Sequence, residues 1–280
     1  MNTWGRRIRL SVFGESHGAA IGMIVDGLPA GEPIDAEELG REMARRAPGL
    51  DPFSTARRER DAVEILSGLK DGRTTGAPIC GLIRNGDARP GDYDGLLRPG
   101  HADWTALLKY GGHADMRGGG HFSGRLTAPL VFAGALARQA LRRRGAAIYG
   151  RIVAIGDAAD AAAPCGEAEW RALAGLKLPA ASDAATRMRA AVAAARADGD
   201  SVGGVVGAAA YGVPGGIGDP FFASVESVVA ALLFSVPAVK GVEFGDGFRL
   251  AGMRGSEAND ALFVEHGAIR SRTNHNGGLL

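Results

Sequence analysis

The sequence predicts a mixed α/β fold made of two related halves that share one core. Short apolar segments typical of strands alternate with helical segments along the 280 residues. Segment 127–144 is apolar almost all round, which predicts a buried central helix, and 221–235 is predicted to be a second strongly apolar helix. Residues 14–31 and 199–216 form an internal repeat, and a helix is expected after each copy. Because two copies are too few for a solenoid, we expect one domain over residues 1–280.

The first half is predicted to alternate strands and helices. Apolar residues occupy every second position of its first strand, at Ile8, Leu10 and Val12. Asp35 opens the first helix, which ends near residue 46, and its spacing to Glu38 predicts a capping box. Further strands are expected at 20–26, 62–66 and 77–83, and a long apolar helix at 127–144.

The second half shows the same alternation with more alanine. The alanine-rich segment 157–181 is predicted to be an exposed excursion. Strands are expected at 148–155, 202–211, 239–244 and 249–253, and helices at 183–196 and 221–235.

The repeat bears directly on one histidine. Seven positions of the first copy, Gly14, Ser16, Gly18, Gly22, Gly27, Pro29 and Gly31, recur without a gap in the second copy. Val202 stands in the second copy where His17 stands in the first. The loop shape therefore does not require histidine, which indicates a chemical role for His17.

The composition argues against several classes of function. A net charge of +1 provides no extended basic surface for nucleic acid or a membrane. Cys80 and Cys165 lack the spacing of a disulfide framework or a zinc site. No apolar run has the length of a membrane span, and the first residues lack a signal-peptide core. We expect a soluble cytoplasmic protein without nucleic-acid or membrane partners.

Residues 98–129 interleave histidine, arginine and glycine and predict an anion-binding site. Glycine lets backbone N–H groups approach an anion, arginine binds phosphate or carboxylate, and histidine transfers protons near neutral pH. The glycines at 118–120 lack the spacing of a dinucleotide-binding loop, so the anion is not identified, and a solvated loop is the alternative. The arginines at 45–46 and 57–60 would clamp a polyanion or form a solvated face. His113 and Asp115 alone are too few to predict a metal site.

Seven motifs, in order along the whole chain, resemble those of chorismate synthases. They are FGESHG (13–18), RRAPG (45–49), RPGHAD (98–103), RGGGHFSGRLTAP (117–129), GDSVGG (199–204), PAVKGVEFGDGF (237–248) and TNHNGG (273–278). That family converts 5-enolpyruvylshikimate 3-phosphate into chorismate by anti 1,4-elimination of phosphate and a ring proton, and it requires reduced FMN. The resemblance implies the same activity here, with NADPH as a candidate reductant. It also implies a homotetramer and a β-α-β sandwich with antiparallel sheets flanking central helices.

The resemblance assigns roles to individual residues. His17 corresponds to the histidine that protonates the leaving phosphate, and His101 to the one that protonates the reduced flavin. The substrate-binding positions are Arg45, Arg46 and Arg125. The flavin-contacting positions are His121, Phe122, Ser123, Pro237 and Ala238.

The sequence departs from the family pattern in three places. His121 and Phe122 stand where many members have arginine and serine, and Pro52 stands where many have an arginine linked to NADPH. The chain stops at Leu280 inside a glycine-rich motif, so we expect a chain shortened at its C-terminus. Because site residues of the last segment would be missing, the alternative is a catalytically impaired or non-catalytic subunit that binds a phospho-ligand or only assembles.

Overall fold

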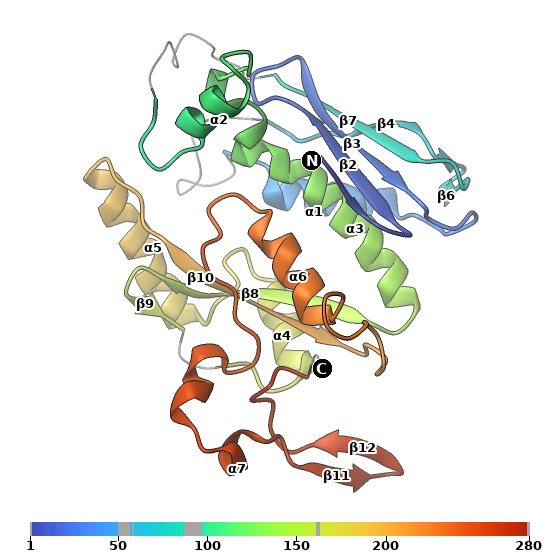
Figure 1. Cartoon of the computed structure of the whole chain (residues 1–280), viewed down its shortest axis with the longest axis vertical. Helices are drawn as coiled ribbons and strands as arrows, with labels where there is room; N and C mark the ends of the chain where they lie inside the picture. The colour runs from blue at the N-terminus through green and yellow to red at the C-terminus, as the bar shows by residue number, and fades with distance from the viewer. Residues whose placement is uncertain (1, 50–56, 58, 87–96, 161–162, 279–280) are drawn as a thin grey trace. The chain divides into compact units, whose positions relative to one another are not determined.

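A five-stranded antiparallel sheet covered by two helices forms the first part of the chain (Figure 1). The computed structural model describes residues 2–49, 57, 59–86, 97–160 and 163–278. The strands follow the order β1 Thr3–Gly5, β2 Arg9–Gly14, β3 Ala20–Asp26, β7 Ile79–Arg84 and β4 Glu64–Ser67. A small hairpin, β5 Leu69–Lys70 and β6 Arg73–Thr74, lies between β4 and β7 in sequence. The helices are α1 Ala36–Arg46 and α3 Thr127–Arg143.

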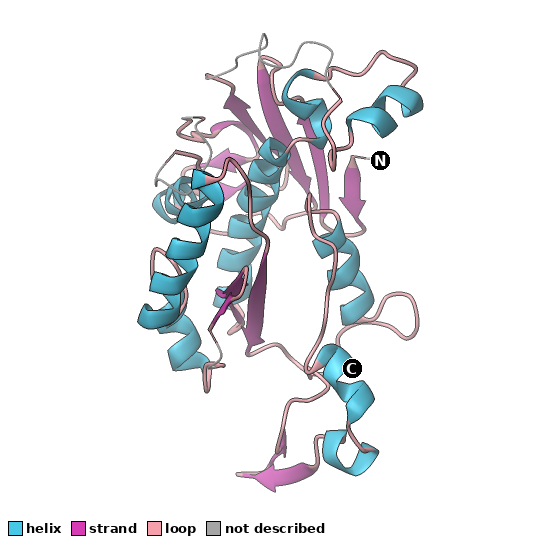
Figure 2. Cartoon of the chain, turned by 90° about the vertical axis from the view of Figure 1, so that its left-hand side faces the viewer, coloured by secondary structure: helices cyan, strands magenta, loops and turns pink. Residues whose placement is uncertain are grey.

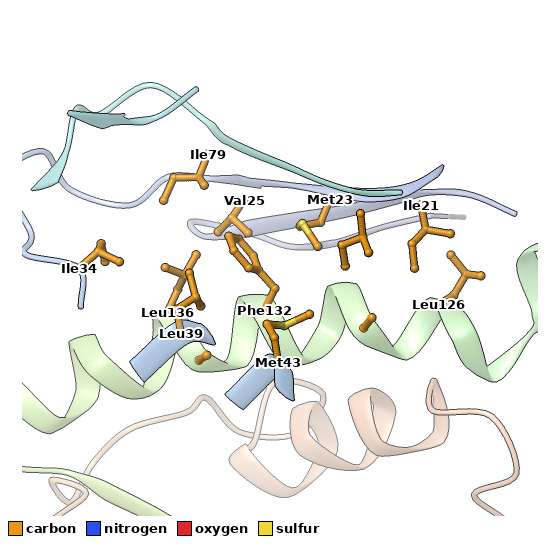
Figure 3. Close-up of a cluster of buried hydrophobic side chains, with 13 residues drawn as sticks. Ile21, Met23, Val25, Ile34, Leu39, Met43, Ile79, Leu126, Phe132 and Leu136 are labelled. Atoms are coloured by element: carbon orange, nitrogen blue, oxygen red, sulfur yellow. The ribbon is translucent and has the colours of Figure 1, made fainter. Parts of the chain in front are cut away.

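One face of this sheet is buried because apolar side chains alternate along its strands. In β3, Ile21, Met23 and Val25 belong to the core, whereas Ile24 between them is 37% exposed. Figure 3 shows these side chains above α3, with Phe132 pointing from the helix toward the strands. The buried face therefore holds the strand ends in place next to α3.

The start of α1 differs from the predicted capping box. The Asp35 carboxylate accepts from the Glu38 N–H at 2.9 Å, as predicted. However, the Glu38 carboxylate is buried and accepts from Arg142 at 2.7 and 3.0 Å and from Arg138 at 3.1 Å. The Asp35 N–H donates instead to Gln139 of α3 at 2.9 Å. A capping box is thus replaced by contacts with a neighbouring helix, which local spacing cannot reveal.

A second antiparallel sheet has the order β10 Gly204–Tyr211, β8 Ala147–Ile155 and β9 Ala158–Ala159. The helices α4 Glu167–Ala174 and α5 Ser182–Ala197 pack on it. The prediction that 157–181 is an exposed excursion holds for most of its described residues, which are exposed or half-buried, and fails at two positions. Asp160 is buried, and its Oδ2 lies 3.4 Å from Nη1 of the buried Arg151. Ala180 is also buried, in a small apolar cluster with Met188.

The chain divides into two compact units, Met1–Val213 and Pro214–Leu280. The second contains α6 Val225–Phe234, a 3₁₀ helix η4 Gly247–Gly252, α7 Gly255–Ala258 and the hairpin β11 Leu262–Glu265 and β12 Ala268–Ser271. The strands predicted at 239–244 and 249–253 are wrong. Gly245 and Gly247 have φ of 58° and 52°, which bends the backbone away from extended geometry between the two segments. The Asp246 carboxylate lies instead within hydrogen-bonding distance of the His275 ring, with 2.6 Å between Oδ2 and Nδ1.

The two copies of the repeat are followed by similar elements. The glycine loop leads into β3 in the first copy and into β10 in the second, and α1 and α6 come next. The element before the loop differs, since it is β2 in one copy and α5 in the other. The chain contains both helices and antiparallel sheets, which Figure 2 distinguishes by colour, so the predicted mixed α/β fold is confirmed. Within the described residues, no helix is long and apolar enough to cross a membrane.

Candidate active site

A turn of three glycines lies against both histidines that the sequence singled out. Gly118, Gly119 and Gly120 in the 3₁₀ segment η2 (Arg117–Phe122) have φ of 58°, 86° and 54°. A Cβ added to Gly118 would overlap the His17 ring, and one added to Gly119 would lie 2.5 Å from His101 Cε1. His17 and His101 therefore contact adjacent residues of one turn, although they are far apart in sequence.

The His17 loop is tied to this turn by backbone contacts. The Ser16 N–H donates to the Gly120 carbonyl at 3.0 Å. The Asn85 side chain, which follows β7, donates to the carbonyls of Glu15 and Gly18 at 3.0 and 2.8 Å. The end of β2, the end of β7 and the glycine turn thus meet around His17.

The His17 ring lies in a cationic environment. Burial lowers the pKa of His17 below 6.5, and the Arg57 and Arg117 guanidinium groups lower it further. Arg57 also donates to the hydroxyl and the carbonyl of Ser16, each at 3.0 Å. An anion bound beside these groups would oppose this shift, because a negative charge favours the imidazolium form.

His101 has a carboxylate partner. Its Nδ1 lies 2.6 Å from Asp103 Oδ1, at the start of α2 (Asp103–Lys109). Arg98 donates from Nε to Asp103 Oδ2 and from Nη2 to Oδ1, both at 2.9 Å. These bonds hold the pKa of the Asp103 carboxyl well below its usual range. The predicted site residue His101 is thus part of an arginine–carboxylate–imidazole group.

A buried ion network lies next to this turn. Arg46 Nη1 contacts Asp61 Oδ2 at 2.5 Å, and Arg125 Nη1 contacts the other oxygen of Asp61. Arg125 Nη2 lies 2.6 Å from Glu59, and Arg57 donates to Glu59 at 2.9 Å. Asp61, Glu59 and Arg125 are almost fully buried. Three guanidinium groups face two carboxylates, so the network keeps an excess positive charge.

Sequence reasoning identified the arginines of this network but missed both acidic residues. Glu59 lies in the segment 57–60, of which only the arginines are predicted to bind an anion, and Asp61 lies just beyond it. The available signal was the alternation of arginine and acid at 58–61. Arg45, in contrast, is half exposed and pairs at 3.6 Å with Glu42 on its own helix, so the described residues do not bring it to the network.

The remaining predicted cofactor residues fall into two groups. His121 stacks on Phe122 with ring centroids 4.3 Å apart, and Tyr110 Oη lies 3.3 Å from His121 Nε2. The Ser123 hydroxyl accepts from the Arg125 N–H at 3.2 Å. Pro237 and Ala238 lie in the second unit, where their role remains a prediction from sequence. Pro52 lies outside the described residues.

Comparisons with known proteins agree with the motifs. A family model described as chorismate synthase matches residues 8–280. Proteins named chorismate synthase from Aeropyrum pernix and Korarchaeum cryptofilum are 47% and 46% identical to this chain over 99% of it, and the matches cover 74% and 78% of those proteins. A solved structure titled "Crystal Structure of Chorismate Synthase" is 29% identical, with a TM-score of 0.81, over 98% of this chain and 79% of that one. The chain therefore belongs to the chorismate synthase family, whose members are lyases of the shikimate pathway.

Proposed function

We propose that this chain forms chorismate by elimination of phosphate and a ring proton from 5-enolpyruvylshikimate 3-phosphate. The observation that carries the proposal is the packing of His17 and His101 on adjacent glycines beside a buried arginine network. Elimination breaks one C–O and one C–H bond and forms a C=C bond. It therefore requires stabilisation of the departing phosphate, a source of a proton for it and an acceptor for the ring proton.

The arginine network supplies the first requirement. Its excess positive charge favours a bound phosphate, and Arg46 and Arg125 are the proposed contacts. Both guanidinium groups are already held by Asp61, so they are oriented before substrate arrives. Preorganised cations cost little reorganisation when charge develops on the leaving group.

His17 supplies the second requirement. Without an anion, burial and nearby guanidinium groups favour its neutral form. A phosphate bound beside it would favour the protonated form. His17 would thus hold a proton when the leaving group is in place and donate it as phosphate departs.

Reduced FMN is the cofactor we propose, and it would supply the electron chemistry of the C–O cleavage and the acceptor for the ring proton. The stacked His121 and Phe122 rings and the Cβ-free glycine turn fit a planar aromatic group. Ser123 keeps its hydroxyl hydrogen available for a cofactor oxygen or nitrogen, since the hydroxyl oxygen acts as the acceptor for Arg125 N–H. His101 would exchange a proton with the bound flavin through its Nε2. NADPH as the reductant and a homotetramer complete the proposal.

The test is chorismate formation under anaerobic conditions with chemically reduced FMN. We expect turnover by the unaltered chain and losses of at least roughly 10²-fold in His17→Ala and His101→Ala, the scale of general acid–base catalysis. His113→Ala is the matched control, because this exposed histidine lies in the same sequence stretch. A folded chain that binds FMN and substrate but forms no chorismate would contradict the proposal.

A further inference from the structure

We propose that Asp103 is a positioning residue that fixes the tautomer of His101, so that Nδ1 carries the hydrogen and Nε2 faces the glycine turn. The consequence for catalysis rests on the proposed function. The tautomer itself does not, because it is a property of the chain without cofactor or substrate.

The geometry assigns opposite surroundings to the two nitrogens of His101. Nδ1 lies 2.6 Å from Asp103 Oδ1, which is hydrogen-bonding distance. The other edge of the ring faces the turn, since a Cβ on Gly119 would lie 2.5 Å from Cε1 and 2.8 Å from Nε2. Nε2 is therefore the nitrogen presented to a bound group.

Asp103 can act only as an acceptor at this position. Its side chain is 3% exposed, and Arg98 donates to it from Nε, from Nη2 and from the backbone N–H at 2.9, 2.9 and 3.0 Å. These donors favour the ionised carboxylate, which has no hydrogen to donate. A hydrogen bond between Asp103 and Nδ1 consequently requires the hydrogen on Nδ1.

Arg98 is compatible with this tautomer. Its Nη2 lies 3.2 Å from His101 Nδ1 and 3.4 Å from Nε2, so it lies against the ring near both nitrogens. A guanidinium group has no acceptor, and it cannot replace the carboxylate as the partner of an N–H. Arg98 thus holds Asp103 in place while Asp103 selects the tautomer. In the catalytic triad of serine proteases, a buried aspartate likewise holds the catalytic histidine in one tautomer.

Asp115 offers a matched control. Arg117 donates to Asp115 from Nε, from Nη2 and from the backbone N–H at 2.9, 2.7 and 3.1 Å, which is the same three-bond pattern on the same sequence stretch. Asp115 has no hydrogen bond to His101 among the described residues. Asp103→Asn and Asp115→Asn therefore each remove the carboxylate from an arginine pair with the same three bonds, although Asp115 is more exposed, and only Asp103 touches His101.

The experiment is long-range ¹H–¹⁵N correlation of ¹⁵N-histidine-labelled protein without flavin or substrate, at a pH where the imidazoles are neutral. Signals of His101 are assigned by their absence in His101→Gln. We expect protonated Nδ1 and unprotonated Nε2 in the unaltered chain and in Asp115→Asn, mixed tautomers in Asp103→Asn, and partial recovery in Asp103→Glu. Unshifted signals of His121, His266 and His275, which contact neither Asp103 nor Asp115 among the described residues, report that each variant is folded.

Turnover provides a second, independent readout. In an active chain, Asp103→Asn should lower kcat by roughly 10²-fold with KM for the substrate little changed, because the defect lies in proton transfer and not in binding. A His101 that carries its hydrogen on Nε2, or a tautomer that is the same in Asp103→Asn, would overturn the inference. Absence of turnover with the expected tautomer would instead contradict the proposed function.

Discussion

Replacing Gly119 by alanine tests whether the glycine turn is built around His101. Gly119 has φ of 86°, and a Cβ there would lie 2.5 Å from His101 Cε1 and 3.0 Å from Arg98 Nη2. Ordinary contacts begin near 3.4 Å, so the imidazole must move by about 1 Å. Displacement of a catalytic group by this amount can cost roughly 10²-fold in rate. We therefore expect kcat/KM of Gly119→Ala to fall by about two orders of magnitude.

Gly112→Ala is the matched control for this experiment. Gly112 lies in the same stretch with φ of 82°, but the nearest atom to an added Cβ is Leu107 Cδ1 at 4.0 Å. Both substitutions place a side chain at a similar positive φ, which costs roughly 1–2 kcal/mol of stability. Urea unfolding should show this loss for Gly112→Ala and a larger one for Gly119→Ala, whose Cβ also overlaps His101, whereas only Gly119→Ala should lose turnover. Equal activity of both variants would refute the argument that the missing Cβ makes room for His101.

Three further outcomes follow from the site. Gly118→Ala should displace His17 and reduce turnover, whereas Gly111→Ala, at nearly the same φ and with no atom closer than 4.0 Å, should not. Asp61→Ala leaves the buried Arg125 and the half-buried Arg46 without their shared partner and should cost about 3–5 kcal/mol in urea unfolding, against at most about 1 kcal/mol for the exposed Asp183→Ala. The pKa of His17 is lowered by folding, so the unfolded chain binds a proton first as pH falls below 6.5. Stability should thus decrease with falling pH in this window, and His17→Gln should weaken the dependence measured by thermal unfolding.

Local patterns predicted most of the elements that carry the site. The strand at 20–26 and the helices around 36–46 and 127–143 lie where alternation and helical periodicity placed them. The strands predicted at 239–244 and 249–253 failed because apolar composition alone does not exclude a bend at glycines with positive φ. The short helix α2 was missed because glycine and charged residues surround its seven residues.

Only those candidate site residues that lie in sequence motifs could be predicted. His17, His101, Arg46 and Arg125 could be named because they occur in motifs with a specific order and spacing. Glu59 and Asp61 could not be named, because their importance comes from burial and pairing. Arg125 lies 64 residues from Asp61 in sequence, so their contact depends on the tertiary packing of the segments that carry them.

Short motifs in a retained order were enough to predict the family, and local periodicity was enough to predict the mixed α/β architecture. Which nitrogen of His101 meets a carboxylate, and which guanidinium groups share Asp61, became known only from the folded chain. The physical reason is that ion pairing and desolvation act over a few ångströms of space, whatever the distance along the chain.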